Sequence, residues 1–163
     1  MLAINESLDL SAFDVAKYFI WKSSQEKRPI TNKKLQKLVY YSYAWYLASN
    51  SGKKRLFPER IEAWIHGPVI PDLYYQYKEF GFGPIDPRLG AEEGITGNKK
   101  TLLDEIWDEY GKLDADTLEA LAHSEPPWRE ARKNLDKDEF GNTEMDDSLI
   151  TSYYSSLKEK MYE

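Results

Sequence analysis

The sequence reads TNKKLQKLVYYSYAWYLA from residue 31 to residue 48. Thr31 is a good helix N-cap, because its hydroxyl can accept a hydrogen bond from a free backbone N–H of the first turn. From Leu38 to Ala48, apolar and aromatic side chains surround the helix instead of forming one stripe. A helix that is apolar on all sides is normally buried. We therefore predict that residues 31–48 form the central helix of the fold, closed by Gly52.

Aromatic side chains fall on consecutive turns of this predicted helix: Tyr40, Tyr41, Tyr43, Trp45 and Tyr46. They cannot all point into one small core. Most are expected to be core residues, because the chain is rich in large rings, with 12 Tyr and 5 Trp. A ring left at the surface would instead be a strong anchor for a protein partner, since Tyr and Trp dominate binding hot spots.

The other elements are predicted from helix caps, turn residues and apolar spacing. Ser11, with Asp14 three residues later, begins a first helix, and Asp114 caps a later one. Alternating residues at 61–66 predict a short strand or hairpin that Gly67-Pro68 ends. The remaining elements are a helix from Pro71 to Gly81, a long loop at 81–98, a helix stopped at Gly111, a break at 125–128 with a short helix to about Lys133, an acidic connector at 136–147 and a last helix reaching Met161. The sequence predicts a mainly α protein, a single compact helical domain of about six to seven helices with a small β-hairpin element.

Composition limits the class of protein. The chain has 163 residues, which suits one domain, and 41% of them are apolar, which is ordinary for a globular protein. Cysteine is absent from the sequence, so disulfides and thiolate chemistry are excluded. No apolar run approaches the roughly 20 residues that a membrane-spanning helix needs. Met1 to Asp9 lack the basic start and the apolar stretch of a secretory signal, so we expect a cytoplasmic protein.

Charge is unevenly distributed along the chain. Residues 1–83 carry 12 basic and 8 acidic side chains, whereas residues 84–163 carry 10 basic and 20 acidic ones, for a net charge of −6. Two interpretations stay open: two differently solvated faces of one domain, or an acidic surface that docks on a basic partner. The net charge argues against general nucleic-acid binding. One basic cluster could contact phosphates, but its neighbouring helix carries aromatics where base-reading polar residues would be needed; its members are Lys22, Lys27, Arg28, Lys33, Lys34 and Lys37.

No recognisable catalytic motif occurs in the sequence. A P-loop, a dinucleotide-binding fingerprint and a nucleophile elbow are all missing. His66 and His123 are the only histidines, and neither has a second ligand at the spacing of a metal motif. They could meet in space and bind a metal with a carboxylate, or each could be a partly buried ring that holds a turn. We favour the second interpretation and predict no catalytic, cofactor-binding or metal-binding residues.

The order of short motifs resembles a known family. The motifs are TNKKLQKLVYY at 31–41 with Ala44 a turn later, Leu56-Phe57, IEAW at 61–64, HGPV at 66–69, a Tyr-rich helix, His123, Pro127-Trp128 and Ala131. Together they resemble the Panacea domain, the antitoxin family that includes SocA-like proteins and phage-associated relatives. The resemblance covers residues 10–155, so we expect the whole chain, 1–163, to be a single Panacea-like domain.

This resemblance implies a helical fold with a small β element and a role in a toxin–antitoxin pair. Such a protein would bind and neutralise a toxin encoded nearby, by direct contact and without catalysis of its own. One branch of the family resembles a proteolytic adaptor that delivers the toxin to the ClpXP protease, so that role stays open. A metal-dependent enzyme using His66 and His123 is less expected. A homo-oligomer is left open, and neither a membrane nor nucleic acid is expected as a partner.

Residues of the recurring motifs have two interpretations. They could contact the toxin, or they could only shape the fold, which we favour for the corners at 66–69 and 123–128. The candidates for partner binding or fold definition are Tyr40, Tyr41, Trp45, Glu62, Trp64, His66, Gly67, Pro68, His123, Pro127 and Trp128.

Overall fold

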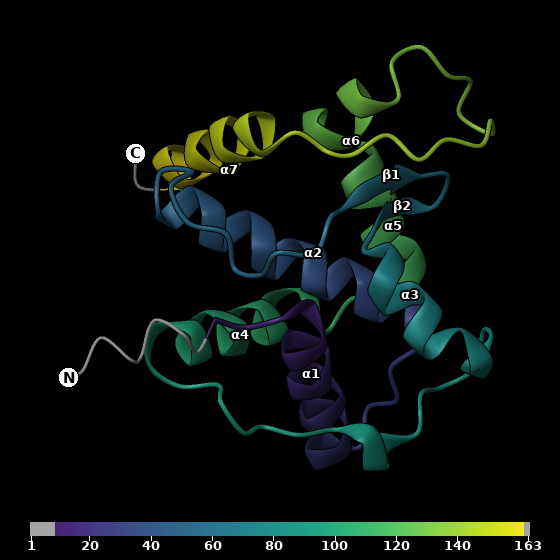
Figure 1. Cartoon of the computed structure of the whole chain (residues 1–163), viewed down its shortest axis with the longest axis vertical. Helices are drawn as coiled ribbons and strands as arrows, with labels where there is room; N and C mark the ends of the chain where they lie inside the picture. Colours follow the sequence, from purple (N-terminus) through teal and green to yellow (C-terminus); the bar gives the residue numbers. More distant parts are fainter. Residues whose placement is uncertain (1–8, 162–163) are drawn as a thin grey trace.

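The structure, a computed structural model, describes residues 9–161 (Figure 1). In chain order these residues form α1 (Ala12–Glu26), α2 (Asn32–Ser49), β1 (Glu62–Trp64), β2 (Gly67–Val69), α3 (Pro71–Tyr77), the 3-10 turns η2 (Lys78–Phe80) and η3 (Pro87–Leu89), α4 (Gly97–Tyr110), α5 (Ala115–His123), α6 (Pro126–Ala131) and α7 (Asp147–Met161). The predicted mainly α fold with one small hairpin is confirmed. The prediction about a secretory signal concerns residues 1–8, which lie outside the described residues, and Asp9. Among residues 9–161, no helix combines the length and the apolar character needed to cross a membrane.

Helix α2 runs through the centre of the molecule, as predicted. The Thr31 hydroxyl accepts a hydrogen bond from the backbone N–H of Lys34 at 3.2 Å, which caps the helix. α1, α3, α4, α5, α7 and β2 all contact α2, and Figure 1 shows it between α7 on one side and α4 and α1 on the other. Because it has neighbours on all sides, most of its side chains from Leu35 to Ala48 are buried.

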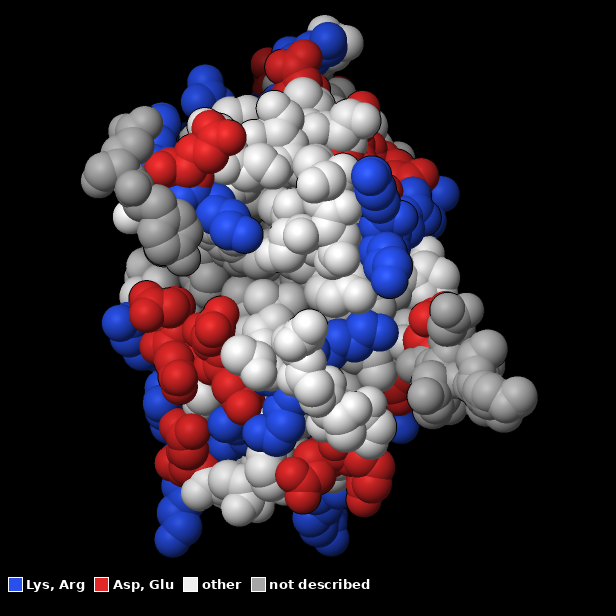
Figure 2. All heavy atoms as spheres, turned by 90° about the vertical axis from the view of Figure 1, so that its left-hand side faces the viewer, with Lys and Arg blue, Asp and Glu red and all other residues white. Residues whose placement is uncertain are grey.

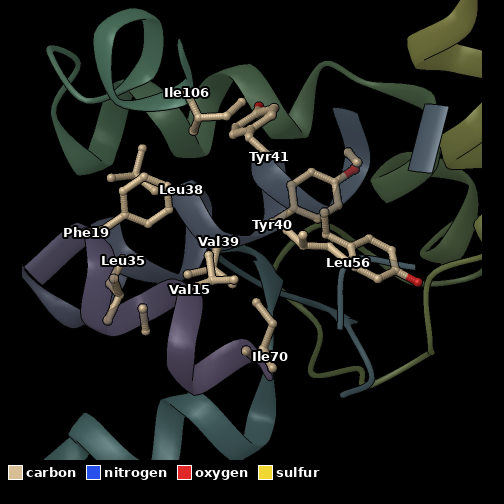
Figure 3. Close-up of a cluster of buried hydrophobic side chains, with 14 of the residues drawn as sticks. Val15, Phe19, Leu35, Leu38, Val39, Tyr40, Tyr41, Leu56, Ile70 and Ile106 are labelled. Carbon is tan, nitrogen blue, oxygen red and sulfur yellow. The ribbon is translucent and has the colours of Figure 1, made fainter. Parts of the chain in front are cut away.

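All the aromatic rings of α2 are at least partly covered. Tyr40, Tyr41 and Tyr43 are no more than 3% exposed, and the other two rings pack against the edge of the core. The expectation that these rings cannot all enter one core, and that most of them are core residues, is therefore confirmed. Since α2 is surrounded, the core extends around it. Figure 3 shows this arrangement, with Phe19 of α1 and Ile106 of α4 both packed among α2 side chains.

Two further predicted helix starts are confirmed by their caps. Ser11 and Asp14 form a capping box at the start of α1. At the start of α5, the Asp114 side chain accepts a hydrogen bond from the backbone N–H of Thr117 at 2.7 Å. The predicted stop at Gly81 is also present, after α3 has tightened into η2. Its φ of +56° lies in the left-handed region that favours glycine.

The hairpin extends further than predicted. Its antiparallel register pairs Glu62 with Val69, Ala63 with Pro68, and Trp64 with Gly67. The expectation that Gly67-Pro68 ends the strand is therefore wrong, because both residues belong to β2. The φ of Gly67 is +108°, which lets the chain turn back directly after Ile65-His66. A Cβ on Gly67 would also lie 2.8 Å from Cε of Lys37, so a larger residue here would have to displace the end of that side chain.

The acidic connector between α6 and α7 lies along this hairpin. The N–H of Ala63 donates a hydrogen bond to the carbonyl of Thr143, and the N–H of Met145 donates one to the carbonyl of Ile61, both at 2.9 Å. These bonds hold the connector beside β1 in the manner of a third strand, and Figure 1 shows it passing β1 on its way to α7. Residues 143–145 of the connector are thus tied to the hairpin.

The uneven charge is partly neutralised inside the molecule. Ion pairs join Lys22 to Asp104 at 3.1 Å, Lys33 to Glu119 at 2.5 Å and Arg55 to Asp147 at 2.8 Å. Each pair links a basic residue of the first half to an acidic residue of the second. Neither sequence-based interpretation of the charge included such pairs. The uneven charge distribution thus allows ion pairs that link the first half of the chain to the second.

Candidate protein-binding site

Most of the candidate residues gather at one place in the fold, which we call the hairpin corner. It consists of the β1–β2 hairpin with α3, α5 and α6 around it (Figure 1). The candidates found there are Glu62, Trp64, His66, Gly67, Pro68, His123, Pro127 and Trp128. Tyr40, Tyr41 and Trp45 lie instead on the part of α2 that contacts α4 and α7. The structure therefore divides the candidates into two groups.

On its inner side, the hairpin corner holds a stack of two rings. The imidazole of His123 lies flat on the indole of Trp128, with ring centroids 4.0 Å apart and planes inclined by 21°. Trp128 is buried, and its Nε1 donates a hydrogen bond to the carbonyl oxygen of Trp64 at 2.8 Å. Burial lowers the pKa of His123, which favours the neutral ring. These contacts support a fold-defining role for both rings.

Arg132 ties the acidic connector to the inner side of the corner. Its guanidinium is buried and donates to the carbonyl of Ala63 at 3.1 Å, to the carbonyl of Asp136 at 3.3 Å, and to the carbonyl of Glu139. It also lies 5.3 Å from the centroid of the Trp128 ring, within reach of a cation–π interaction. Sequence reasoning missed Arg132. Its only signal was the spacing of four from Trp128, which places both on one helix face.

A buried amine supports the second strand of the hairpin. Lys37 of α2 is 1% exposed, and its Nζ donates a hydrogen bond to the carbonyl of Pro68 at 3.2 Å. Burial lowers the pKa of Lys37 to about 7, with a smaller effect from the nearby charge of Lys33. The sequence placed Lys37 in a basic cluster that could contact phosphates, but Lys37 is buried, because α2 is covered on this side by β2.

On its outer side, the corner carries exposed aromatic rings. We call Trp64, Tyr74 and Tyr75 the aromatic ladder. The ring centroids of Trp64 and Tyr74 are 5.1 Å apart, and those of Tyr74 and Tyr75 are 5.4 Å apart, both in edge-to-face geometry. Tyr75 is 62% exposed, whereas Trp64 and Tyr74 are half-buried. Such a surface suits a protein partner, because Tyr and Trp bury large areas with few rotatable bonds.

The ladder is held in place by charged neighbours. The Nε1 of Trp64 donates a hydrogen bond to Oε1 of Glu62 at 2.9 Å, and Glu62 pairs with Arg60 at 2.9 Å. At the other end, the ammonium of Lys78 lies 5.7 Å from the centroid of the Tyr75 ring. Sequence reasoning named Trp64 and Glu62 but missed Tyr75. The Tyr74-Tyr75 doublet was the available signal, since adjacent helical residues cannot both face the same core.

His66 departs from its predicted role. Its side chain is 70% exposed and pairs with Glu119 at 3.2 Å, so it is not the partly buried ring that was expected. The tight turn at Ile65-His66 points the imidazole outward. Because Glu119 also pairs with Lys33, His66 belongs to an exposed charged cluster between the hairpin turn and α5.

A comparison with known protein families identifies the family of this chain and covers most of the hairpin corner. The sequence model of the family described as antitoxin SocA-like, Panacea domain, matches residues 35–129. The chain belongs to this antitoxin family. No curated protein and no solved structure gives a significant match. The resemblance stated from the motifs is thus confirmed, over a shorter stretch than the expected 10–155.

The Panacea match includes every residue of the aromatic ladder and of the His123–Trp128 stack. It leaves out α1, α7 and Arg132. The hairpin corner is therefore built mainly from the part of the chain that defines the family. The connector, which bonds to β1, contacts the corner from outside the matched segment.

In this Panacea domain, Tyr41 and Tyr154 hold a buried carboxyl group, and Tyr40 packs against Tyr154. Glu125 is 4% exposed, and its Oε1 accepts a hydrogen bond from the Tyr154 hydroxyl at 2.5 Å and from the Tyr41 hydroxyl at 3.4 Å. Burial raises the pKa of Glu125 to about 7, although its tyrosine hydrogen bonds act in the opposite direction. Nothing in the sequence distinguished Glu125 except its position before Pro126.

Trp45 lies at the edge of the same cluster. Its Nε1 donates a hydrogen bond to the Tyr110 hydroxyl at 2.9 Å, and the Tyr110 ring stacks on Tyr41 with centroids 4.2 Å apart. The contacts of Tyr40, Tyr41 and Trp45 join α2 to α4 and α7. They support a fold-defining role for this group of candidates.

A metal site at the two histidines finds no support in the described residues. Within residues 9–161, no three His, Cys, Asp or Glu side chains lie close enough to hold a metal ion. His66 points outward to Glu119, whereas His123 points inward onto Trp128.

Proposed function

We propose that this protein is an antitoxin that neutralises a protein toxin by direct contact, and that the aromatic ladder at the hairpin corner is the contact surface. The observation that carries the proposal is the ladder itself: edge-to-face rings of β1 and α3, ending in the exposed Tyr75, within the segment matched by the antitoxin family. The toxin is encoded nearby and both proteins act in the cytoplasm.

The physical basis is preorganisation. Trp64 is fixed by Glu62 from the side and by the Trp128 hydrogen bond to its carbonyl, so little conformational freedom is lost on binding. Tyr75 is the most exposed ring and fits the role of an anchor that enters a pocket on the toxin. A rigid antitoxin bound over the active site of the toxin blocks that site sterically, without catalysing a reaction.

One continuous core supports treating the chain as a single domain. Its buried residues extend from Leu10, before α1, to Tyr154 in α7. An antitoxin of this type acts as one rigid body, and the ladder is displayed by the hairpin corner of that body.

The test is whether this protein co-purifies with the product of the neighbouring gene and rescues cell growth when that product is expressed. Tyr75→Ala should weaken binding about tenfold or more, since hot-spot truncations cost about 2 kcal/mol or more. Phe140→Ala is the matched control, because Phe140 is a 73% exposed aromatic residue on the connector. Equal affinities for both variants would contradict the ladder as the contact surface. Failure of the wild-type protein to bind or rescue would contradict the antitoxin role itself.

Delivery of the toxin to a protease such as ClpXP is the competing mechanism. It needs a second surface, free while the ladder is occupied, and the groove between α4 and α7 described below is one. The lifetime of the toxin separates the mechanisms. Plain neutralisation predicts that the antitoxin prolongs or preserves the toxin level in cells, whereas an adaptor predicts faster toxin loss that depends on the protease.

A further inference from the structure

An apolar groove runs between α4 and the last turns of α7. These turns of α7 lie at the opposite end of α2 from the hairpin corner (Figure 1). Its volume is about 980 Å³. The apolar lining comes from three helices and the α4–α5 turn, and it consists of Trp45, Leu102, Ile106, Tyr110, Leu113, Leu157 and Met161. Figure 2 shows the side of the molecule on which these helices end, where uncharged surface lies between acidic and basic side chains.

The α4 rim of the groove is acidic and unneutralised. Glu105, Asp108 and Glu109 line it and are exposed. None of the three makes an ion pair or a side-chain hydrogen bond with any described residue, whereas Asp104 on the same helix pairs with Lys22. Carboxylates three and four residues apart on a helix repel one another. The repulsion along this rim is therefore not relieved within the described part of the chain.

The opposite rim, on α7, is basic. Lys158 and Lys160 line the groove there, and they too form no ion pair with a described residue. Met161 beside them is 71% exposed. An apolar floor between one acidic and one basic rim matches the surface of an amphipathic helix that has a basic edge and an acidic edge.

We propose that the α4–α7 groove binds an amphipathic helix of a partner protein, with Lys or Arg of that helix against Glu105, Asp108 and Glu109, and with Asp or Glu of that helix against Lys158 and Lys160. The apolar stripe of the partner helix packs on Trp45, Leu157 and Met161. The opposite charges of the two rims fix the direction in which the helix lies. This surface is separate from the aromatic ladder, so its occupation does not depend on the proposed toxin contact.

Its position relative to the family match adds a second argument. α4 lies within residues 35–129, but α7, which supplies the basic rim, lies outside them. The groove is therefore assembled by a shared helix and a helix that the family model does not include. It suits recognition of a partner specific to this chain.

The test uses a synthetic 18-residue helical peptide with a leucine stripe, lysines along one edge and glutamates along the other. Its near-zero net charge avoids general attraction to the acidic protein. We expect saturable binding with amide shifts confined to α4, α7 and the end of α2. A peptide of the same composition with the stripe scrambled should not bind. Shifts centred elsewhere, or equal binding of the scrambled peptide, would overturn the proposal.

Charge reversal provides the decisive variants. Replacing Glu105, Asp108 and Glu109 by lysine should weaken peptide binding about tenfold or more, because the new lysines would repel the lysines of the peptide. The same variant should gain binding to a peptide with glutamates on both edges, which the wild type rejects. The matched control replaces Glu92, Glu93 and Asp138, exposed residues outside the groove, by lysine, with the same change in net charge. Equal effects of the two sets would contradict a specific site.

A second variant keeps the proposal testable if the triple variant is poorly folded. Met161→Asn changes an exposed groove residue without changing charge, and it should weaken the peptide while leaving the unfolding transition unchanged. Sedimentation of the free protein addresses a second copy as the occupant. A dimer that the charge-reversed variant loses, but the control variant keeps, would assign the groove to self-association and reject the proposed partner.

Discussion

The indole Nε1 of Trp128 donates a hydrogen bond to the backbone carbonyl oxygen of Trp64 at 2.8 Å. The two residues are 64 positions apart, one buried in α6 and the other partly exposed in β1. The bond connects the buried stack beneath the hairpin to the aromatic ladder above it. The position of the partly exposed Trp64 thus depends on the buried ring of Trp128.

Trp128→Phe should retain most of the packing and lose this bond. The carbonyl of Trp64 would then lack its partner in a largely buried place, so we expect a loss of roughly 1–3 kcal/mol in the free energy of unfolding. Denaturant unfolding measures it. Trp21→Phe is the control, because Trp21 is partly buried and its indole nitrogen has no hydrogen-bond partner among residues 9–161. Equal losses in both variants would show that ring size, and not the hydrogen bond, is responsible.

Glu125→Gln should change how stability depends on pH. Burial raises the folded-state pKa of Glu125 to about 7, above its ordinary value of 4.5. Between these values the folded chain keeps a proton that the unfolded chain loses, so the contribution of Glu125 falls as pH rises through this window. The difference is on the order of 3 kcal/mol. Unfolding of wild type and variant at a series of pH values measures it, and parallel curves from pH 4.5 to 7 would contradict the assignment.

Lys37→Met tests the buried amine, whose contribution to stability changes with pH in the opposite direction to that of Glu125. Burial lowers the folded-state pKa of Lys37 from 10.5 to about 7. Between those values the unfolded chain holds a proton that the folded chain lacks, so the contribution of Lys37 to stability rises with pH through this window. The variant should lack this rise, which is on the order of 5 kcal/mol. Exposed Lys133→Met is the control and should follow the wild type from pH 7 to 10.5.

Arg132→Lys should loosen the acidic connector while preserving the charge. A lysine cannot reproduce the fork that contacts the carbonyls of Ala63, Asp136 and Glu139. We expect a loss of roughly 2–4 kcal/mol in stability and faster amide hydrogen exchange at Met145, which pairs with the hairpin. Arg129→Lys, on the exposed face of the same helix, should lose no more than about 0.5 kcal/mol. If the amide of Met145 exchanged as slowly in the Arg132 variant as in the wild type, the hydrogen bonds between the connector and β1 alone would hold the connector.

Local signals explain the elements that were predicted correctly. The hydroxyl of Thr31 and the all-round apolar character of residues 38–48 are properties of adjacent residues, and they defined α2 without knowledge of its neighbours. The hairpin was placed correctly but ended too early. Gly-Pro ordinarily breaks a strand, and only the fold shows that Lys37 packs against Gly67 and donates to Pro68.

Buried polar groups could not be predicted, because their partners are distant in sequence. Glu125 receives its hydrogen bonds from Tyr41 and Tyr154, and nothing near Glu125 in the sequence indicates them. The exposure of Tyr75 likewise depends on how α3 packs beside the hairpin. The motifs identified the family and the corner, but they favoured its buried residues over the exposed rings that a partner would meet.

The contact of α2 with α7 also determines when the core of this protein can be completed during synthesis. Tyr40 and Tyr41 are covered by Tyr154 of α7, which follows every other helix in the chain. During synthesis, one side of the central helix therefore stays uncovered until α7 has emerged from the ribosome, and pairing across such a long separation is slow. A chain cut before α7 would leave that side of α2 exposed, and such exposed apolar surface favours aggregation.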